Sequence, residues 1–124
     1  MKKFRVYVCP ICHDVIPYYG EELGLTCCNE EMKELEANTS DGVLEKHVPV
    51  VKKEGSRIAV DVGSITHPMS EEHQIVFIAL EEESGYQIHY LKPTDVPEAI
   101  FESKTGQTVY EYCNLHGLWK KYID

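Results

Sequence analysis

The segment Gln74-Ile75-Val76-Phe77-Ile78-Ala79-Leu80 decides the fold, because six of its seven residues are apolar. Successive side chains of a β-strand point to opposite faces of the sheet, so this segment presents apolar groups on both faces. A strand of this kind lies in the centre of a sandwich or at a subunit interface. The segment is also much shorter than the roughly 20 apolar residues that a membrane-spanning helix needs.

Shorter strand patterns recur on both sides of this segment. Arg57–Val62 alternates cleanly and places Ile58, Val60 and Val62 on one face. Further strands are expected at 48–53, 86–90, 99–102, 107–113 and 118–123. About seven short strands without a convincing helix predict an all-β fold, an antiparallel β-sandwich of immunoglobulin-like type.

A polar stretch, Ala37-Asn38-Thr39-Ser40-Asp41-Gly42, separates these strands from the N-terminal part of the chain. We therefore expect two domains, over residues 1–37 and 38–124. The first domain is small. It begins with a strand over Phe4–Val8 and ends with a short strand or turn within residues 30–36.

Composition limits the classes of function. Asp and Glu number 21 against 12 Lys and Arg, which gives a net charge of −9. Contacts with phosphates need a basic surface, so nucleic-acid binding is not expected. No apolar run has the length of a membrane span, and the N-terminus lacks the apolar core of a secretory signal, so we expect no membrane association and a cytoplasmic location.

Four of the five cysteines lie within the first 28 residues, as two pairs. The spacing of Cys9 and Cys12 lets two thiolates face one ion, and Cys27 and Cys28 complete a set of four. Because adjacent residues of a strand point to opposite faces, the backbone must turn at the second pair if both ligate. The alternative is two disulfides or a reduced thiol cluster, and disulfides are rare in the cytoplasm. By ligand type alone, four thiolates suit zinc and mononuclear iron equally well.

A second set of candidate ligands lies at the ends of the expected strands. The fifth cysteine, Cys113, is followed three positions later by His116, a compact pair able to chelate. Three more histidines lie where loops meet strands: His47, His67 and His73. Together these residues offer four imidazoles and one thiolate, more ligands than a structural zinc site takes. Such a set would leave a sixth position open for a small molecule.

A single histidine at a strand end is more often solvated or hydrogen-bonded than bound to a metal. We interpret His13 and His89 in this way, because His13 directly follows a cysteine ligand and His89 shares a polar strand face with Gln87. The number of the remaining histidines and their placement favour a metal site.

The chain resembles the desulfoferrodoxin family, the two-iron form of superoxide reductase, along nearly its whole length. The motifs that carry the resemblance are Cys9-Pro10-Ile11-Cys12, Cys27-Cys28-Asn29, Glu45-Lys46-His47-Val48-Pro49, His67-Pro68-Met69 with His73, Leu91-Lys92-Pro93, and Cys113-Asn114-Leu115-His116-Gly117 with Trp119.

The resemblance implies a small desulforedoxin-type, rubredoxin-like metal module followed by a catalytic sandwich, with two iron ions per chain. The implied ligands are Cys9, Cys12, Cys27 and Cys28 for the rubredoxin-like iron, and His47, His67, His73, Cys113 and His116 for the catalytic iron. The implied reaction is the one-electron reduction of superoxide to hydrogen peroxide without release of dioxygen. Rubredoxin or a similar donor would re-reduce the iron, and the family is typically homodimeric.

The resemblance also implies catalytic roles for the two residues that precede His47. Lys46 would attract superoxide and help to order the water that protonates the peroxide. An acidic protein with an anionic substrate needs a local cation of this kind. Glu45 would ligate the oxidised iron and leave on reduction. Without these roles, Glu45 and Lys46 would form a solvated charge pair on a loop.

Two other classes of function remain open from the residues themselves. The chain could be a rubredoxin-like electron carrier in which only the four-cysteine centre is functional and the sandwich is a non-catalytic interaction module. It could instead be a zinc-binding structural or adaptor protein without redox chemistry. Metal content and visible absorption distinguish these alternatives from an oxidoreductase.

Overall fold

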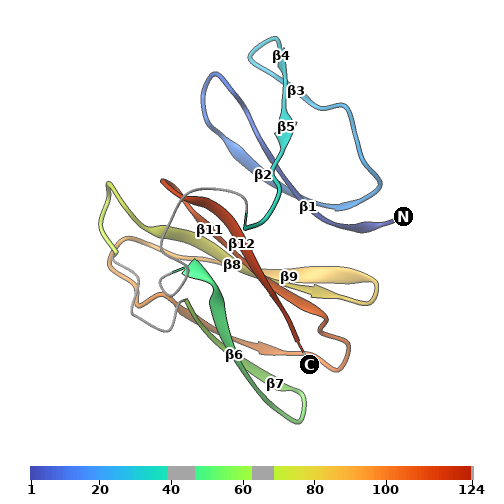
Figure 1. The fold of residues 1–124 in the computed structure, drawn as a ribbon, viewed down its shortest axis with the longest axis vertical. Helices are drawn as coiled ribbons and strands as arrows, with labels where there is room; N and C mark the ends of the chain where they lie inside the picture. Colours follow the sequence, from blue (N-terminus) through green and yellow to red (C-terminus); the bar gives the residue numbers. More distant parts are fainter. Residues whose placement is uncertain (39–46, 63–68, 124) are drawn as a thin grey trace. The chain divides into compact units, whose positions relative to one another are not determined.

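The computed structural model describes residues 1–38, 47–62 and 69–123, and these residues form twelve β-strands (Figure 1). The described strands pair in an antiparallel manner throughout. The predicted all-β class is therefore confirmed. The chain divides into two compact units, Met1–Glu36 and Ala37–Asp124. Across the described ranges, no helix has the length and apolarity that crossing a membrane requires.

The N-terminal unit contains a three-stranded sheet in the order β2-β1-β5. β1 (Lys3–Val8) pairs along its whole length with β2 (Val15–Gly20), and the end of β1 also pairs with β5 (Lys33–Glu34). A separate hairpin joins β3 (Thr26–Cys27) to β4 (Glu30–Glu31). The hairpin carries the second cysteine pair, and the end of β1 leads into the first.

β2 was not predicted from the sequence, because Pro17 interrupts its run of apolar and aromatic residues. Proline lacks the backbone N–H that a central strand donates to its neighbour. β2 is an edge strand of its sheet, where a missing donor is tolerated.

The C-terminal unit is a sandwich of two antiparallel sheets, one in the order β10-β7-β6 and the other in the order β12-β11-β8-β9. Its strands are β6 (Pro49–Glu54), β7 (Arg57–Val62), β8 (Ile75–Glu82), β9 (Gly85–Tyr90), β10 (Glu98–Glu102), β11 (Thr108–Cys113) and β12 (Gly117–Tyr122). Each of these strands was expected from the sequence, with ends that agree to within two residues.

The core of the sandwich lies between its two sheets. Ile58, Val60 and Val62 of β7 point into it, as their alternation predicted, and meet side chains such as Ile78 and Leu80 of β8. β8 lies between β11 and β9, so the doubly apolar segment occupies a central strand. Burying apolar surface of this kind contributes about 25 cal/mol per Å² and anchors the strands whose ends carry the candidate site.

Two neighbouring strand ends bring distant parts of the sequence together. Cys113 at the end of β11 lies opposite Ile75 at the start of β8, with a register shift between Tyr112 and Cys113. A bulge of this kind bends the strand and re-aims the side chain that follows it. The residues just before β8 and just after β11 therefore meet at one edge of the sandwich.

Candidate metal centres

The four N-terminal cysteines converge in space. Cys9 and Cys12 follow β1, whereas Cys27 ends β3 and Cys28 begins the turn to β4. Their sulfur atoms all lie within 4.8 Å of one another, with 3.7 Å between Cys12 Sγ and Cys27 Sγ and 3.9 Å between Cys27 Sγ and Cys28 Sγ. Four thiolates arranged tetrahedrally at about 2.3 Å from one ion lie roughly 3.8 Å apart. The donor set and its spacing therefore fit a tetrahedral iron or zinc ion, and the four cysteines are free thiols rather than disulfides.

A tight turn lets two adjacent cysteines face the same point. Cys28 and Asn29 both have positive φ, 54° and 61°. They occupy the two central positions of the β3–β4 hairpin, where a type I′ turn requires left-handed backbone at both residues. The reversal expected from two adjacent ligands is thus present, and Asn is one of the residues that tolerate this conformation.

Backbone N–H groups point at the most buried of the four sulfurs. The N–H groups of Ile11 and Cys12 donate to Cys9 Sγ at 3.4 and 3.5 Å. These bonds, above all the one from Cys12, lower the pKa of Cys9 to about 7. A hydrogen bond to Cys9 raises the pKa of Cys27 to about 12. Without metal, Cys9 is therefore the readily ionised thiol, and a metal must displace the proton of Cys27.

The second group combines three histidines with the fifth cysteine. The ligand atoms of His47, His73, Cys113 and His116 lie within 4.8 Å of one another. His116 Nδ1 is 3.0 Å from His47 Nε2 and 3.9 Å from Cys113 Sγ. His47 and Cys113 are almost completely buried. Imidazole and thiolate ligands suit zinc, iron or copper rather than magnesium or calcium, so the donor chemistry fits an iron ion.

Trp119 contacts two of these candidate ligands, His47 and His116. Its ring stacks on that of His47 at a centroid distance of 5.0 Å, and its Nε1–H donates to the carbonyl of His116 at 3.1 Å. The side chain is buried, so its indole N–H needs such a partner. The sequence marked Trp119 only as part of a motif, and the structure gives it a positioning role.

Asn114 joins the loop that carries His73 to the end of β11. Its side-chain amide donates to the carbonyl of Glu72 at 3.0 Å and accepts the N–H of Gln74 at 2.9 Å. The backbone N–H of Asn114 also donates to the carbonyl of Gln74, at 3.2 Å. Asn114 thereby fixes the spacing between His73 and Cys113. Sequence reasoning missed this role, and the only signal for it was a polar residue beside a candidate ligand.

The loop before β8 is also closed upon itself. Ser70 donates its backbone N–H to the carbonyl of His73 at 2.9 Å, and its hydroxyl oxygen accepts the N–H of His73 at 3.2 Å. Met69 Sδ accepts the N–H of Ile75 at 3.3 Å. These bonds set the direction in which His73 leaves the backbone.

Burial keeps Cys113 protonated in the absence of metal. Desolvation raises the pKa of this thiol, although the N–H groups of Leu115 and His116 act in the opposite direction. A metal that binds Cys113 must therefore displace the proton of this thiol.

Glu111, two residues earlier on β11, is also fully buried, and desolvation raises its pKa well above the usual carboxyl value.

Eight of the nine predicted ligands fall within the described residues, and the structure brings them together as two separate groups. His67 and the two expected catalytic residues, Glu45 and Lys46, lie outside the described residues. Within the described ranges, His13 and His89 belong to neither ligand group, and the ring of His89 packs on Phe101 at 4.5 Å.

Comparison with known proteins gives concordant matches. The family model described as Desulfoferrodoxin matches residues 39–122. The chain is 40% identical over 121 residues to the desulfoferrodoxin of Desulfarculus baarsii, with 96% of each chain covered. It is 43% identical over 120 residues to that of Nitratidesulfovibrio vulgaris, with 95% of each covered. The crystal structure of the superoxide reductase from Treponema pallidum matches with a TM-score of 0.80 and 27% identity, over 97% of this chain and 98% of that one.

Proposed function

We propose that the chain, which belongs to the desulfoferrodoxin family, is a superoxide reductase, which reduces superoxide to hydrogen peroxide without releasing dioxygen. One observation carries the proposal: His47, His73, Cys113 and His116 converge at one edge of the sandwich, in a chain of which 97% aligns with the superoxide reductase from Treponema pallidum. A metal held there by nitrogen and sulfur would supply the single electron that superoxide takes up together with two protons.

The proposed ligands of the catalytic iron are His47, His67, His73, Cys113 and His116. The described residues alone offer three imidazoles and a thiolate, which would suit a four-coordinate zinc site equally well. A fifth ligand, His67, would distinguish a redox-active iron site from a four-coordinate zinc site. Cys113 would bind as a buried thiolate, and a thiolate ligand donates electron density to the metal.

Lys46 and Glu45 are the proposed catalytic side chains. Lys46 precedes the buried ligand His47, so its ammonium group would lie near the substrate position in a protein whose net charge is −9. It would draw in the superoxide anion and hold the water that delivers a proton. Glu45 would occupy the substrate position in the oxidised resting state and leave on reduction.

The N-terminal unit is proposed as a desulforedoxin-like domain over residues 1–37, with Cys9, Cys12, Cys27 and Cys28 as ligands of the second iron. The catalytic domain would span residues 38–124. Rubredoxin or a similar protein would supply electrons, the protein would be a homodimer, and the free thiols suit the reducing cytoplasm.

Metal analysis together with the visible spectrum in both redox states tests the proposal. A superoxide reductase of this family contains two iron ions per chain with two distinct chromophores, and the ferrous protein consumes superoxide. Iron at the four cysteines alone would instead identify an electron carrier, the second candidate. A colourless protein with stoichiometric zinc would contradict both.

A further inference from the structure

A groove of about 540 Å³ lies in the N-terminal unit, beside the four-cysteine group. Its wall includes Pro10, which separates the first two cysteine positions, and residues of β4 and β5. Tyr7, Leu23 and Met32 supply its apolar lining. The Tyr7 hydroxyl accepts the N–H of Leu23 at 3.0 Å, so the polar atom of this lining already has a partner.

The apolar lining of the groove is continuous with the surroundings of one cysteine sulfur. Tyr7 and Met32 form one buried cluster with Cys9. A molecule seated in the groove would therefore touch side chains that themselves contact a proposed iron ligand. This arrangement suits electron exchange, because one layer of packed side chains would separate the occupant from the cysteine.

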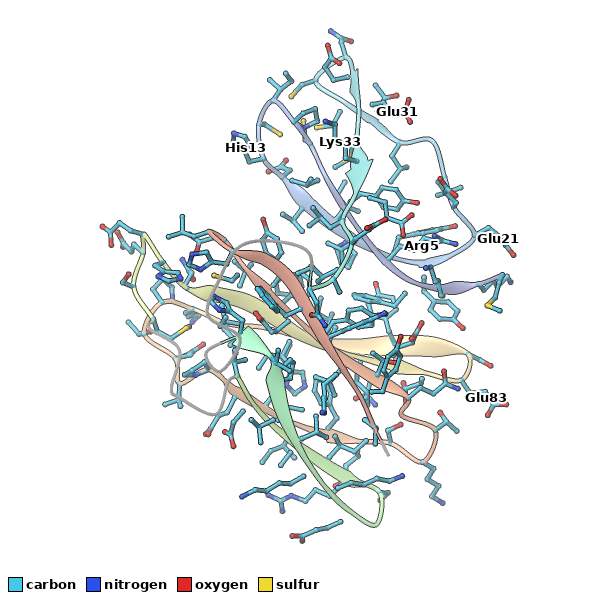
Figure 2. All side chains as sticks on the ribbon, viewed as in Figure 1. Arg5, His13, Glu21, Glu31, Lys33 and Glu83 are labelled. Carbon is cyan, nitrogen blue, oxygen red and sulfur yellow. The ribbon has the colours of Figure 1, made fainter. Side chains whose placement is uncertain are left out.

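The charged residues that line the groove favour a basic partner. The groove is lined by Glu22, Glu30, Glu31 and Glu34 and by one cation, Lys33. Glu34 forms a two-pronged ion pair with Arg5 at 3.0 and 3.1 Å, whereas the other three carboxylates form no ion pair within the described ranges. Figure 2 shows Glu31 projecting outward from the unit, with His13 on its opposite side. Iron bound by four thiolates would add further negative charge.

We infer that this groove is the docking surface for a basic electron-transfer protein that exchanges electrons with the four-cysteine centre. An apolar centre with a charged rim is the usual anatomy of a protein interface. Complementary charge would speed the encounter and orient the partner. A second copy of the chain is a poorer occupant, because it carries a net charge of −9. The inference rests on the proposed function, since it requires a redox-active iron at the four cysteines.

The test uses cytochrome c, a basic redox protein, as the probe, and the holoprotein throughout. Calorimetry measures binding with both proteins oxidised, so that no electron moves. Anaerobic stopped-flow spectroscopy then measures electron transfer from the ferrous four-cysteine centre to ferricytochrome c. The groove variant is Glu22→Lys combined with Glu31→Lys. The control is Glu54→Lys combined with Glu98→Lys, which changes the net charge equally at two exposed carboxylates of the C-terminal unit.

We expect the groove variant to weaken binding and slow electron transfer about tenfold or more at low ionic strength, with a flatter dependence on salt. The control variant should stay within about twofold of the wild type. Leu23→Ala should weaken binding without changing the salt dependence. The visible spectrum of the four-cysteine iron should be the same in every variant.

An equal loss in the control variant would show that only net charge matters and would overturn the inference, as would unchanged binding by the groove variant. A change in oligomeric state on ultracentrifugation of the groove variant would assign the groove to a second copy instead. Loss of superoxide consumption concerns the other centre and contradicts the proposed function alone. Absence of iron from the four cysteines would overturn the inference alone, because superoxide consumption is proposed for the other centre.

Discussion

Asn29 shows how one residue governs the geometry of a metal site. It lies in left-handed backbone, with φ of 61°, directly after the two adjacent cysteines proposed as ligands. We predict that Asn29→Val destabilises the metal-loaded N-terminal unit by about 1–2 kcal/mol, because a β-branched residue is strained in this conformation. Asn29→Gly should be close to neutral. The rate at which a chelator removes the metal from each variant measures the difference.

Equal rates of metal loss from the valine and glycine variants would contradict this explanation. The turn would then be held by the metal itself rather than by the preference of the residue. Near-ultraviolet spectra of the loaded proteins should confirm that each variant starts from a complete four-cysteine site.

Lys46 supports a second prediction about a single residue. Lys46→Ala should slow the reaction of the ferrous protein with superoxide about tenfold or more, because the anionic substrate loses its local cation. The spectrum of the catalytic iron should stay largely unchanged. Lys46→Arg keeps the charge and should retain most of the rate. Pulse radiolysis at several ionic strengths measures the rate constants.

An unchanged rate constant for Lys46→Ala would remove the steering role from this residue. A loss of iron from the variant would place its effect on the ligand His47 rather than on the substrate.

Candidate ligands were easier to predict from sequence than the residues that position them. Cys9 and Cys12 have a recognisable spacing, and Cys113 has a histidine three positions later. Asn114 has no such signal. Its role arises from the carbonyl of Glu72 and the N–H of Gln74, which only the folded chain brings near its side chain. The same holds for the stacking of Trp119 on a histidine.

The contact between the loop before β8 and the end of β11 depends on Asn114. We predict that Asn114→Ala destabilises the protein by about 1 kcal/mol, because it removes two side-chain hydrogen bonds whose exposed backbone partners can bind water instead. It should also weaken metal binding at the histidine site, since His73 and Cys113 would lose their fixed spacing. Thermal unfolding and competition with a metal chelator measure the two effects.

Gln87→Ala is the matched control. It also removes a side-chain amide that joins two strands, through its bond to the carbonyl of Glu102 at 2.8 Å. Gln87 is paired with Leu80, towards the other end of β8 from the histidine site. The control should lose stability without losing metal affinity. Equal losses of affinity in both variants would contradict the positioning role of Asn114.

Strands were predictable where burial sets the pattern. β7 alternates because one face lies in the core, and β8 is apolar on both faces because it is central. β2 was not predicted, because Pro17 interrupts its run of apolar residues. As an edge strand it also shows little of the alternation that burial produces. The short β3 and β4 depend on a turn and a cysteine cluster rather than on any periodicity.

The two units of the molecule differ in what stabilises them. The N-terminal unit spans Met1–Glu36, and its cysteine-containing core cluster includes Tyr7 and Met32. Chains below about 40 residues usually need metals, disulfides or partners to fold. The sandwich instead has an extended apolar core shared by its two sheets. The first unit should therefore depend on its metal far more than the second.

Removal of metal tests this difference. We predict that a chelator which strips the four-cysteine site unfolds residues 1–36 and leaves the sandwich folded, because binding and folding of a small metal unit are coupled. Amide hydrogen exchange should show loss of protection in β1 and β2 and retained protection in β8 and β11. Readdition of metal should restore protection. Loss of protection in both units together would show that they fold cooperatively.

At the scale of the whole molecule, net charge supports an expectation about binding partners. The net charge of −9 disfavours nucleic-acid binding, which needs a basic surface, and this expectation stays a prediction. The groove in the N-terminal unit was not predictable, since its lining comes from segments that meet only after folding.

We propose that this protein reduces superoxide rather than disproportionating it. A stoichiometric titration tests this: known amounts of superoxide are added to the fully ferrous protein under anaerobic conditions, and hydrogen peroxide, dioxygen and oxidised iron are counted. We predict about one peroxide for each superoxide consumed, one catalytic iron oxidised and no dioxygen, as a one-electron metal-centred reduction requires. Release of dioxygen with half that yield of peroxide, or no consumption of superoxide, would show that the protein is not a superoxide reductase.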